Sequence, residues 1–164
     1  MAKGAASIEL TKQSQANFDS QMRKLERRMD MSVDKGLIKF MQNVKNRAQS
    51  RLKARGHNDT TRLVNSISVQ DKRGSDNERL NVTLQDHEFA VGTNVEYAAA
   101  VELGSRPHII RAKNAKTLGT PDTGYFGKEV HHPGYGGDSY LYWAARTASI
   151  DDTVQAIKKE LKIK

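Results

Sequence analysis

The sequence predicts an α+β fold, with a long N-terminal helix and a C-terminal helix packed on a small, mainly antiparallel sheet. Three observations lead to it: apolar residues recur every three or four positions in the first third, β-branched residues cluster in the middle, and a second amphipathic segment ends the chain. We expect residues 1–16 to form a flexible arm and residues 17–164 one domain. The expected parts of that domain are a long basic helix over 17–55, a sheet with short helices and a glycine-rich loop over 56–138, and the C-terminal helix over 139–163.

The composition limits the class of protein. A chain of 164 residues and 18.3 kDa fits one domain. Only 37% of residues are apolar and 28% are charged, so the core is thin or shared with partners, which favours an extended or oligomeric protein. The absence of cysteine excludes disulfides, thiolate zinc sites and cysteine nucleophiles. No segment has the apolar core of a signal peptide or the roughly 18 apolar residues of a membrane span, so we expect a soluble protein without membrane contact.

The N-terminal helix is predicted from one apolar stripe of about 35 residues, roughly 52 Å long. Its members are Phe18, Met22, Leu25, Met29, Val33, Leu37, Met41, Val44, Ala48 and Leu52. Gly56 and the polar residues after it can end the helix. One face of the helix is therefore expected to pack, and the other face to be polar.

The polar face of this helix is basic. Residues 1–56 carry thirteen Lys and Arg against five Asp and Glu, whereas the rest of the chain is balanced. Such a segment attracts phosphates or an acidic protein surface, although a solvated helix face is the simpler reading of any single lysine. The candidate DNA-facing residues are Arg23, Lys24, Arg27, Arg28, Lys35, Arg47 and Arg51.

The middle of the chain predicts a small sheet. After the short helical segment "TRLVNSI", the segments "SISVQ", "RLNVTLQ" and "FAVGTNV" are typical of an antiparallel meander. The segment "NVEYAAAVELG" predicts a short helix that ends at Gly104, and "RPHII" predicts extended chain after it. A glycine-rich loop or hairpin should follow, and Ser139 or Asp138 should cap the C-terminal helix.

The usual signatures of an enzyme are missing. The five histidines, with Glu96, Glu102 or Asp138, suggest a nuclease-like metal cluster, but the adjacent His131 and His132 lack the spacing of a helical zinc motif and would point to opposite faces of a strand. The sequence contains no phosphate-binding loop and no serine elbow. We therefore expect no catalytic residue, no metal and no cofactor.

Four segments follow one another between Asp59 and Arg146: "DTTRLVNSI", "VGTNVEYAAAVELGSRPHIIRAKNAKTL", "GKEVHHPG" and "SYLYWAAR". In order and spacing they resemble the motifs of the phage tail-completion family, minor tail or tail-component proteins of the virion neck. The matching positions are Gly92, Thr93, Tyr97, Ala98, Val101, Glu102, Gly104, Ala112, Lys113, His132, Pro133, Gly134 and Leu141. Ser105 stands where many relatives have Thr, "SYLYWAA" replaces Pro-Phe-Leu, and the N-terminal third is similar only in being a long helix.

The resemblance implies assembly rather than catalysis. It implies a structural virion protein, made in the host cytoplasm, that forms a ring of copies of itself, expected to number six, and helps join head to tail around the DNA passage. Its partners would be neck and tail proteins such as a stopper, a terminator or the tail tube, with non-specific contact to DNA in transit. One alternative is the tail-terminator ring itself. The other is a non-specific DNA-binding protein acting through the basic helix. The aromatic residues argue against it, because they lie far from that helix in sequence, whereas base stacking would need them close to it.

The candidate interface with subunits or partners lies around the corner that Gly104 makes. Its members are Tyr97, Val101, Glu102, Gly104, Arg106, His108, His132, Pro133, Gly134 and Tyr135. For Glu102 two roles stay open: a salt bridge or cap near the corner, with Arg106 as one candidate partner, or a contact to a neighbouring subunit.

Overall fold

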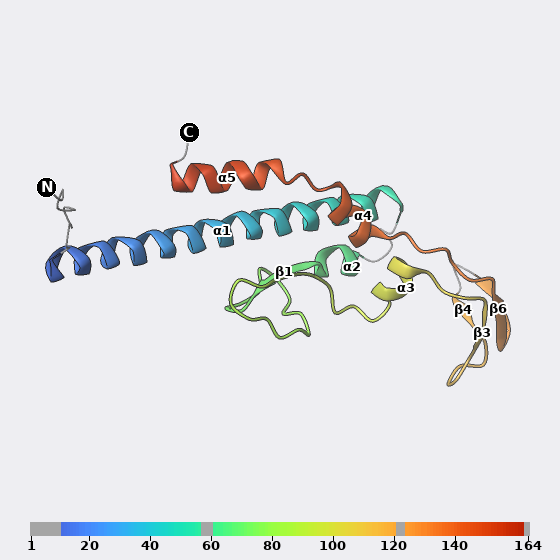
Figure 1. Cartoon of the computed structure of the whole chain (residues 1–164). Coiled ribbons are helices and arrows are strands. Elements are labelled where there is room, and N and C mark those ends of the chain that lie inside the picture. Colours follow the sequence, from blue (N-terminus) through green and yellow to red (C-terminus); the bar gives the residue numbers. More distant parts are fainter. Residues whose placement is uncertain (1–10, 57–60, 121–123, 163–164) are drawn as a thin grey trace, which may run out of the picture. The chain divides into compact units, whose positions relative to one another are not determined.

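The computed structural model describes residues 11–56, 61–120 and 124–162 (Figure 1). Its helices are α1 (Lys12–Ala54), α2 (Thr61–Ser66), α3 (Ala98–Leu103), α4 (Tyr140–Thr147) and α5 (Asp151–Leu161). Its strands are β1 (Ser68–Asp71), β2 (Phe89–Gly92), β3 (His108–Arg111), β4 (Gly119–Thr120), β5 (Gly124–Tyr125) and β6 (Glu129–His132). The strands pair two by two, always antiparallel, so the α+β class is confirmed.

The chain divides into two compact units. The helix-pair unit, Met1–Phe40 with Ser149–Lys164, contains the first part of α1 together with α5. The sheet unit, Met41–Ala148, contains the last part of α1 and all the other elements. Helix α1 therefore contributes to both.

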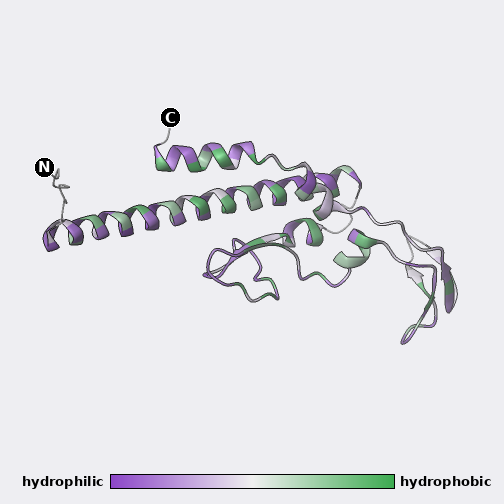
Figure 2. Cartoon of the chain, in the orientation of Figure 1, coloured by the Kyte–Doolittle hydropathy of each residue, from purple (hydrophilic) through white to green (hydrophobic). Residues whose placement is uncertain are grey.

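Helix α1 begins at Lys12, earlier than the expected residue 17, while residues 1–10 of the expected arm lie outside the described residues. The Thr11 hydroxyl accepts the Ser14 N–H at 3.2 Å, which satisfies one of the free donors at the start of the helix. Apolar positions recur along the whole of α1 (Figure 2). In the helix-pair unit α1 meets α5 at Gly36, where an added Cβ would lie 2.6 Å from the Ile157 side chain.

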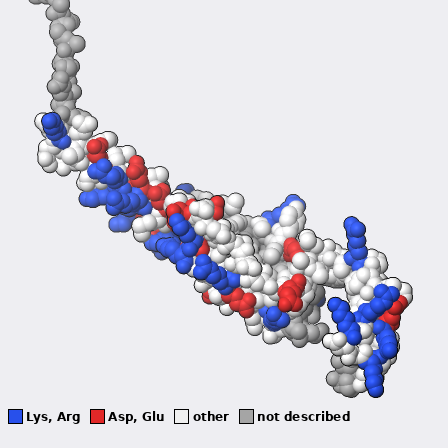
Figure 3. Space-filling model, turned by 90° about the horizontal axis from the view of Figure 1, so that it is seen from below, with Lys and Arg blue, Asp and Glu red and all other residues white. Residues whose placement is uncertain are grey.

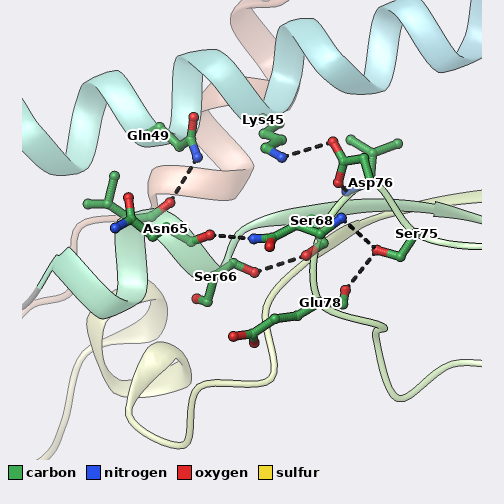
Figure 4. Close-up of polar contacts among 11 residues, drawn as sticks. Lys45, Gln49, Asn65, Ser66, Ser68, Ser75, Asp76 and Glu78 are labelled. Atoms are coloured by element: carbon green, nitrogen blue, oxygen red, sulfur yellow. Dashed lines mark hydrogen bonds and ion pairs between the residues drawn. The ribbon is translucent and has the colours of Figure 1, made fainter.

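The core of the sheet unit is formed by the last part of α1, α2, β1 and α4. Its most buried apolar side chains are Val44, Ala48, Leu52, Leu63, Ile67, Tyr140 and Ala144. Polar contacts tie α1 to the segments around β1 (Figure 4). The Lys45 ammonium lies 2.8 Å from the Asp76 carboxylate, and the Gln49 amide donates to the Val64 carbonyl at 2.9 Å.

The expected three-stranded meander is wrong, because the segment over 79–85 forms no strand. β1 pairs directly with β2, with Val69 opposite Val91. The intervening backbone bonds to side chains instead: Gln70 accepts the Leu80 N–H at 2.6 Å and donates to the Val82 carbonyl at 3.3 Å. These bonds satisfy backbone groups that a neighbouring strand would otherwise satisfy.

The chain after α3 forms one long antiparallel hairpin, which we call the β-ribbon (residues 105–120 and 124–135). Ser105 bridges Tyr135 at its base, β3 pairs with β6, and β4 pairs with β5 further out. Every residue of β3 is exposed, so the ribbon has little core of its own. The sequence predicted either a loop or a hairpin here, and the structure shows a hairpin.

The expected single C-terminal helix is also wrong. Helix α4 ends at Thr147, and Ala148 is extended at ψ 131°. The Ser149 hydroxyl then accepts the Asp151 N–H at 3.1 Å, at the start of α5. The boundary between the two units falls in this break.

Candidate functional site

The corner predicted from the sequence brings two distant segments together. Chain that leaves α3 through Gly104 runs against chain that returns from the ribbon before α4. Ser105 and Tyr135 exchange both backbone hydrogen bonds at 2.8 Å, and the Asp138 N–H donates to the Val101 carbonyl at 2.7 Å. The structure thus places the interface candidates before and after the ribbon beside one another.

Two glycines allow this close approach. Gly104 has a φ of 86°, and a Cβ there would lie 2.2 Å from the Tyr135 carbonyl oxygen. Gly137 has a φ of 74°, and its Cβ would lie 2.6 Å from the Gly104 nitrogen. Both positions have a left-handed backbone and leave no room for a Cβ beside the backbone of the other segment. Any other residue would therefore force the two segments apart.

Glu102 caps α4 from within the chain. Its two carboxylate oxygens accept the N–H groups of Leu141 at 2.9 Å and Tyr142 at 3.0 Å. A negative charge is favourable at a helix N-terminus, where free N–H groups and the helix dipole are both positive. Ser139 cannot cap in the expected way, because its backbone is left-handed and its side chain makes no cap bond. The cap role left open for Glu102 is therefore present, but its partner is α4 and not Arg106.

Tyr140, the first residue of α4, is fully buried behind this cap. Its hydroxyl has no hydrogen-bond partner among the described residues. Burial raises the pKa of the Tyr140 hydroxyl far above its usual value, and the charge of Glu102 raises it further. Tyr140 therefore stays neutral and acts as part of the core.

A small hollow lies beside the cap, between the end of β2, α3 and the start of α4. Its volume is about 320 Å³. The residues that line it include Thr93, Ala98, Leu103 and Leu141. Leu103 is 79% exposed, the largest exposed fraction among the bulky apolar side chains that the structure describes. The corner thus presents an apolar side chain to solvent next to a shallow apolar hollow.

His108 and His132 stack across the base of the ribbon, with ring centroids 4.9 Å apart. His108 Nδ1 lies 2.8 Å from the Arg106 carbonyl and so carries a proton, whereas His132 Nδ1 accepts the Gly134 N–H at 3.0 Å. A metal at Nε2 of His132 would require a proton on the nitrogen that accepts this bond, so the pair is poorly suited to share an ion. Within the described ranges no three His, Asp or Glu side chains converge as metal ligands, and His57 lies outside those ranges.

The candidate basic surface divides into two groups. Lys35 pairs with Glu160 at 2.6 Å, Arg47 bonds to Thr147, and Arg51 is engaged with α4 and the residue before it. The remaining four are exposed on α1 and form no ion pair within the described part of the chain: Arg23, Lys24, Arg27 and Arg28. Acidic side chains lie between the basic ones along this stretch (Figure 3).

A clamp around Asp138 was not found by reasoning from the sequence. Its carboxylate, 5% exposed, lies 3.4 Å from both Arg51 and Arg55, and Arg51 donates to its carbonyl at 3.0 Å. The Arg51 guanidinium also lies 4.8 Å from the Trp143 ring centroid. Nothing in the local sequence marks Asp138 as a partner of residues so far away. The one signal in the sequence is an acidic residue that follows two glycines at the start of a helix. The clamp joins the end of α1 to the start of α4.

None of the helices in the described ranges is long and apolar enough to cross a membrane. Among curated proteins and among solved structures, none matches the chain. One family model does match, over residues 16–104; its description reads "Bacteriophage HK97-gp10, putative tail-component". The match includes most of α1, beyond the resemblance seen in the sequence, and stops at Gly104, before the ribbon. Since it covers more than half of the sequence, the chain belongs to the HK97-gp10-like family of bacteriophage tail components.

Proposed function

We propose that this tail component acts as a tail-completion protein of the virion neck. In this role it forms a ring with copies of itself and takes part in joining head to tail around the DNA passage. It acts by assembly and performs no catalysis. The neighbours in this role are a stopper, a terminator or the tail tube.

The observation that carries the proposal is an apolar stripe on the first part of α1. We define it as Phe18, Met22, Leu25 and Met29, which are exposed by 61%, 39%, 45% and 49%. A globular monomer rarely leaves a contiguous apolar patch without a partner. In a chain with so few apolar residues, this exposure favours association.

The stripe continues an interface that the chain already forms. Its spacings of four, three and four residues are those of a helix seam that packs against another helix. Seven residues beyond Met29, on the same face of α1, lies Gly36, against which Ile157 of α5 is packed. Helix α5 ends at Leu161, so it covers only the Gly36 end of this face. The proposed occupant of the rest is a helix from a second copy.

The charges beside the stripe favour one orientation of that second copy. Asp19 and Glu26 flank one edge of the stripe, and Gln21 and Arg28 flank the other. An antiparallel pair of α1 helices would place acid against acid, whereas a parallel pair would not. Neighbouring subunits of a cyclic ring are related by rotation about one axis, so parallel helices are compatible with a ring.

The test is head-to-tail joining in an extract from a phage that lacks this protein. Adding the wild-type chain should restore joined particles, counted by electron microscopy and by infectivity. Met29→Glu should abolish the restoration, because it places a charge on the stripe. Met31→Glu is the matched control: Met31 is 60% exposed, lies two residues away and is off the stripe. Joining that proceeds without the protein, or equally with both variants, would contradict the proposal.

A second candidate is non-specific DNA binding through α1. It is favoured by the exposure of Arg23, Lys24, Arg27 and Arg28. Residues 12–34, however, include five basic and four acidic residues, so the net positive charge of this part of α1 is small. A tail-terminator ring remains the alternative within the same class, and it would bind the tail end without the head.

A further inference from the structure

The β-ribbon carries an exposed excess of positive charge. Its basic residues are Arg106, Arg111, Lys113, Lys116 and Lys128. Its described part holds one acidic residue, Glu129, which is already bound to Arg111 at 2.8 Å. All five basic residues are exposed. In Figure 3 basic side chains gather on the ribbon with little acid between them, whereas acidic side chains lie among the basic ones on the first part of α1.

The remaining cations of the ribbon are available to a partner. Arg106, Lys113, Lys116 and Lys128 form no ion pair within the described ranges. The ribbon also lies beyond Gly104, where the match to the family model ends.

The form of the ribbon suits one kind of polyanion. A two-stranded antiparallel ribbon is narrow enough to lie in the major groove of duplex DNA, where lysines on both strands reach phosphates. A two-stranded hairpin with no core is marginally stable alone and gains order from what it binds. Phosphate contacts of this kind carry no sequence information.

We propose that the β-ribbon binds the phosphate backbone of duplex DNA without sequence preference. The recognising groups are the side chains of Arg106, Lys113, Lys116 and Lys128. This goes beyond the proposed function, which requires only contacts between proteins, and it moves the DNA contact from α1 to the ribbon. The rival partner of the same charge is an acidic protein surface.

The experiment measures binding of the full-length chain to a short, fluorescently labelled duplex of arbitrary sequence at several salt concentrations. One variant carries Lys113→Gln, Lys116→Gln and Lys128→Gln. The matched control carries Arg23→Gln, Lys24→Gln and Arg27→Gln on α1, so both lower the formal net charge of +8 by the same amount. All six positions are exposed, and thermal unfolding checks that both variants fold.

We expect wild-type affinity to fall steeply with salt. The ribbon variant should weaken binding more than about tenfold and reduce the slope of log affinity against log salt by up to about 2.7, near 0.9 for each lost phosphate contact. The control on α1 should stay within about threefold of the wild type. A duplex of unrelated sequence should bind equally well.

Three results would overturn the proposal: no salt-dependent duplex binding by the wild type, equal losses in both variants, or a larger loss in the α1 variant. If the wild type does not bind DNA and the ribbon variant nevertheless loses head-to-tail joining, the partner of the ribbon is an acidic protein surface instead. Because duplex binding is measured without heads or tails, its failure is distinguishable from failure of the neck assignment.

Discussion

The two ends of α1 carry the same apolar spacing in opposite environments. Toward its C-terminus, in the sheet unit, Val44, Ala48 and Leu52 are at most 1% exposed. Toward its N-terminus, in the helix-pair unit, Phe18 and Leu25 are exposed by 61% and 45%. Spacing determines which face of a helix is apolar, but coverage depends on what the rest of the chain brings to that face. The uncovered end therefore points to a partner outside the chain.

The basic residues of α1 show the same contrast. Toward the C-terminus, Lys45 pairs with Asp76, and Arg51 and Arg55 pair with Asp138. The four basic residues from 23 to 28 form no ion pair in the described part of the chain. One end of the helix is thus held by its own chain in both its apolar and its polar contacts, whereas the described residues hold the other end in neither way.

The largest effect should come from truncating a buried leucine at the covered end. Leu52→Ala should lower the free energy of unfolding by about 2–5 kcal/mol, because it leaves a cavity in the core of the sheet unit. Leu25→Ala, at the uncovered end, should change it by less than about 0.5 kcal/mol in the monomer. Urea unfolding followed by circular dichroism measures both. Equal losses would show that the two ends do not differ as described.

The next effect should come from the clamp that joins α1 to α4. Arg51→Ala removes a hydrogen bond, an ion pair and the contact with the Trp143 ring, and should cost about 1–3 kcal/mol. Arg27→Ala, at the uncovered end, is the control and should be close to neutral. If Arg51→Ala unfolds at the wild-type urea midpoint, the clamp does not stabilise the covered end.

A smaller effect should follow from removing the cap on α4, which the covered end of α1 contacts. Glu102→Ala loses both bonds to the N-terminus of α4 and should cost about 1 kcal/mol. The exposed Glu96 is the control, since Glu96→Ala removes an acid that caps no helix. If Glu102→Ala is as stable as Glu96→Ala, the Glu102 carboxylate does not stabilise the fold, and a contact to a neighbouring subunit is the role that is left for it.

The smallest effect concerns Lys35 and Glu160, the ion pair between α1 and α5. The bond to the Lys35 ammonium and its charge lower the pKa of the Glu160 carboxyl below its usual 4.5. A lowered folded-state pKa gives stability that is present above 4.5 and lost as the pH falls through the folded value. The thermal midpoint of the wild type should therefore exceed that of Glu160→Gln slightly at pH 7, and the two should converge in acid. A difference independent of pH would mean that the charge of Glu160 does not matter.

The elements that sequence alone predicted were those with a strong period. The spacing along α1 was enough to place the helix, and "NVEYAAAVELG" placed α3 and its end at Gly104. The segment over 79–85 looked like a strand because it contains the β-branched residues Val82 and Thr83, yet the Gln70 side chain bonds to two of its backbone groups. That side chain competes with strand pairing in a way that propensity does not register.

The candidate site was predicted in outline only. The glycines around positions 104 and 137 indicated a turn, but not that the two segments cross backbone to backbone. The cap by Glu102 and the clamp on Asp138 join residues 39 and 87 positions apart, and such pairs leave no local pattern. The charge of the ribbon was hidden because the chain as a whole places its excess in the first third.

In the proposed ring, a second copy of the chain covers the uncovered end of α1. The most direct test is the mass of the purified protein by light scattering, at rising concentration and with tail tubes from a phage that lacks it. We expect the mass of a closed ring, a multiple of 18.3 kDa, either for the protein alone or on the tube end. Met29→Glu should abolish this ring, and Met31→Glu should preserve it. A single chain of 18.3 kDa under every condition, with or without tubes, would contradict it.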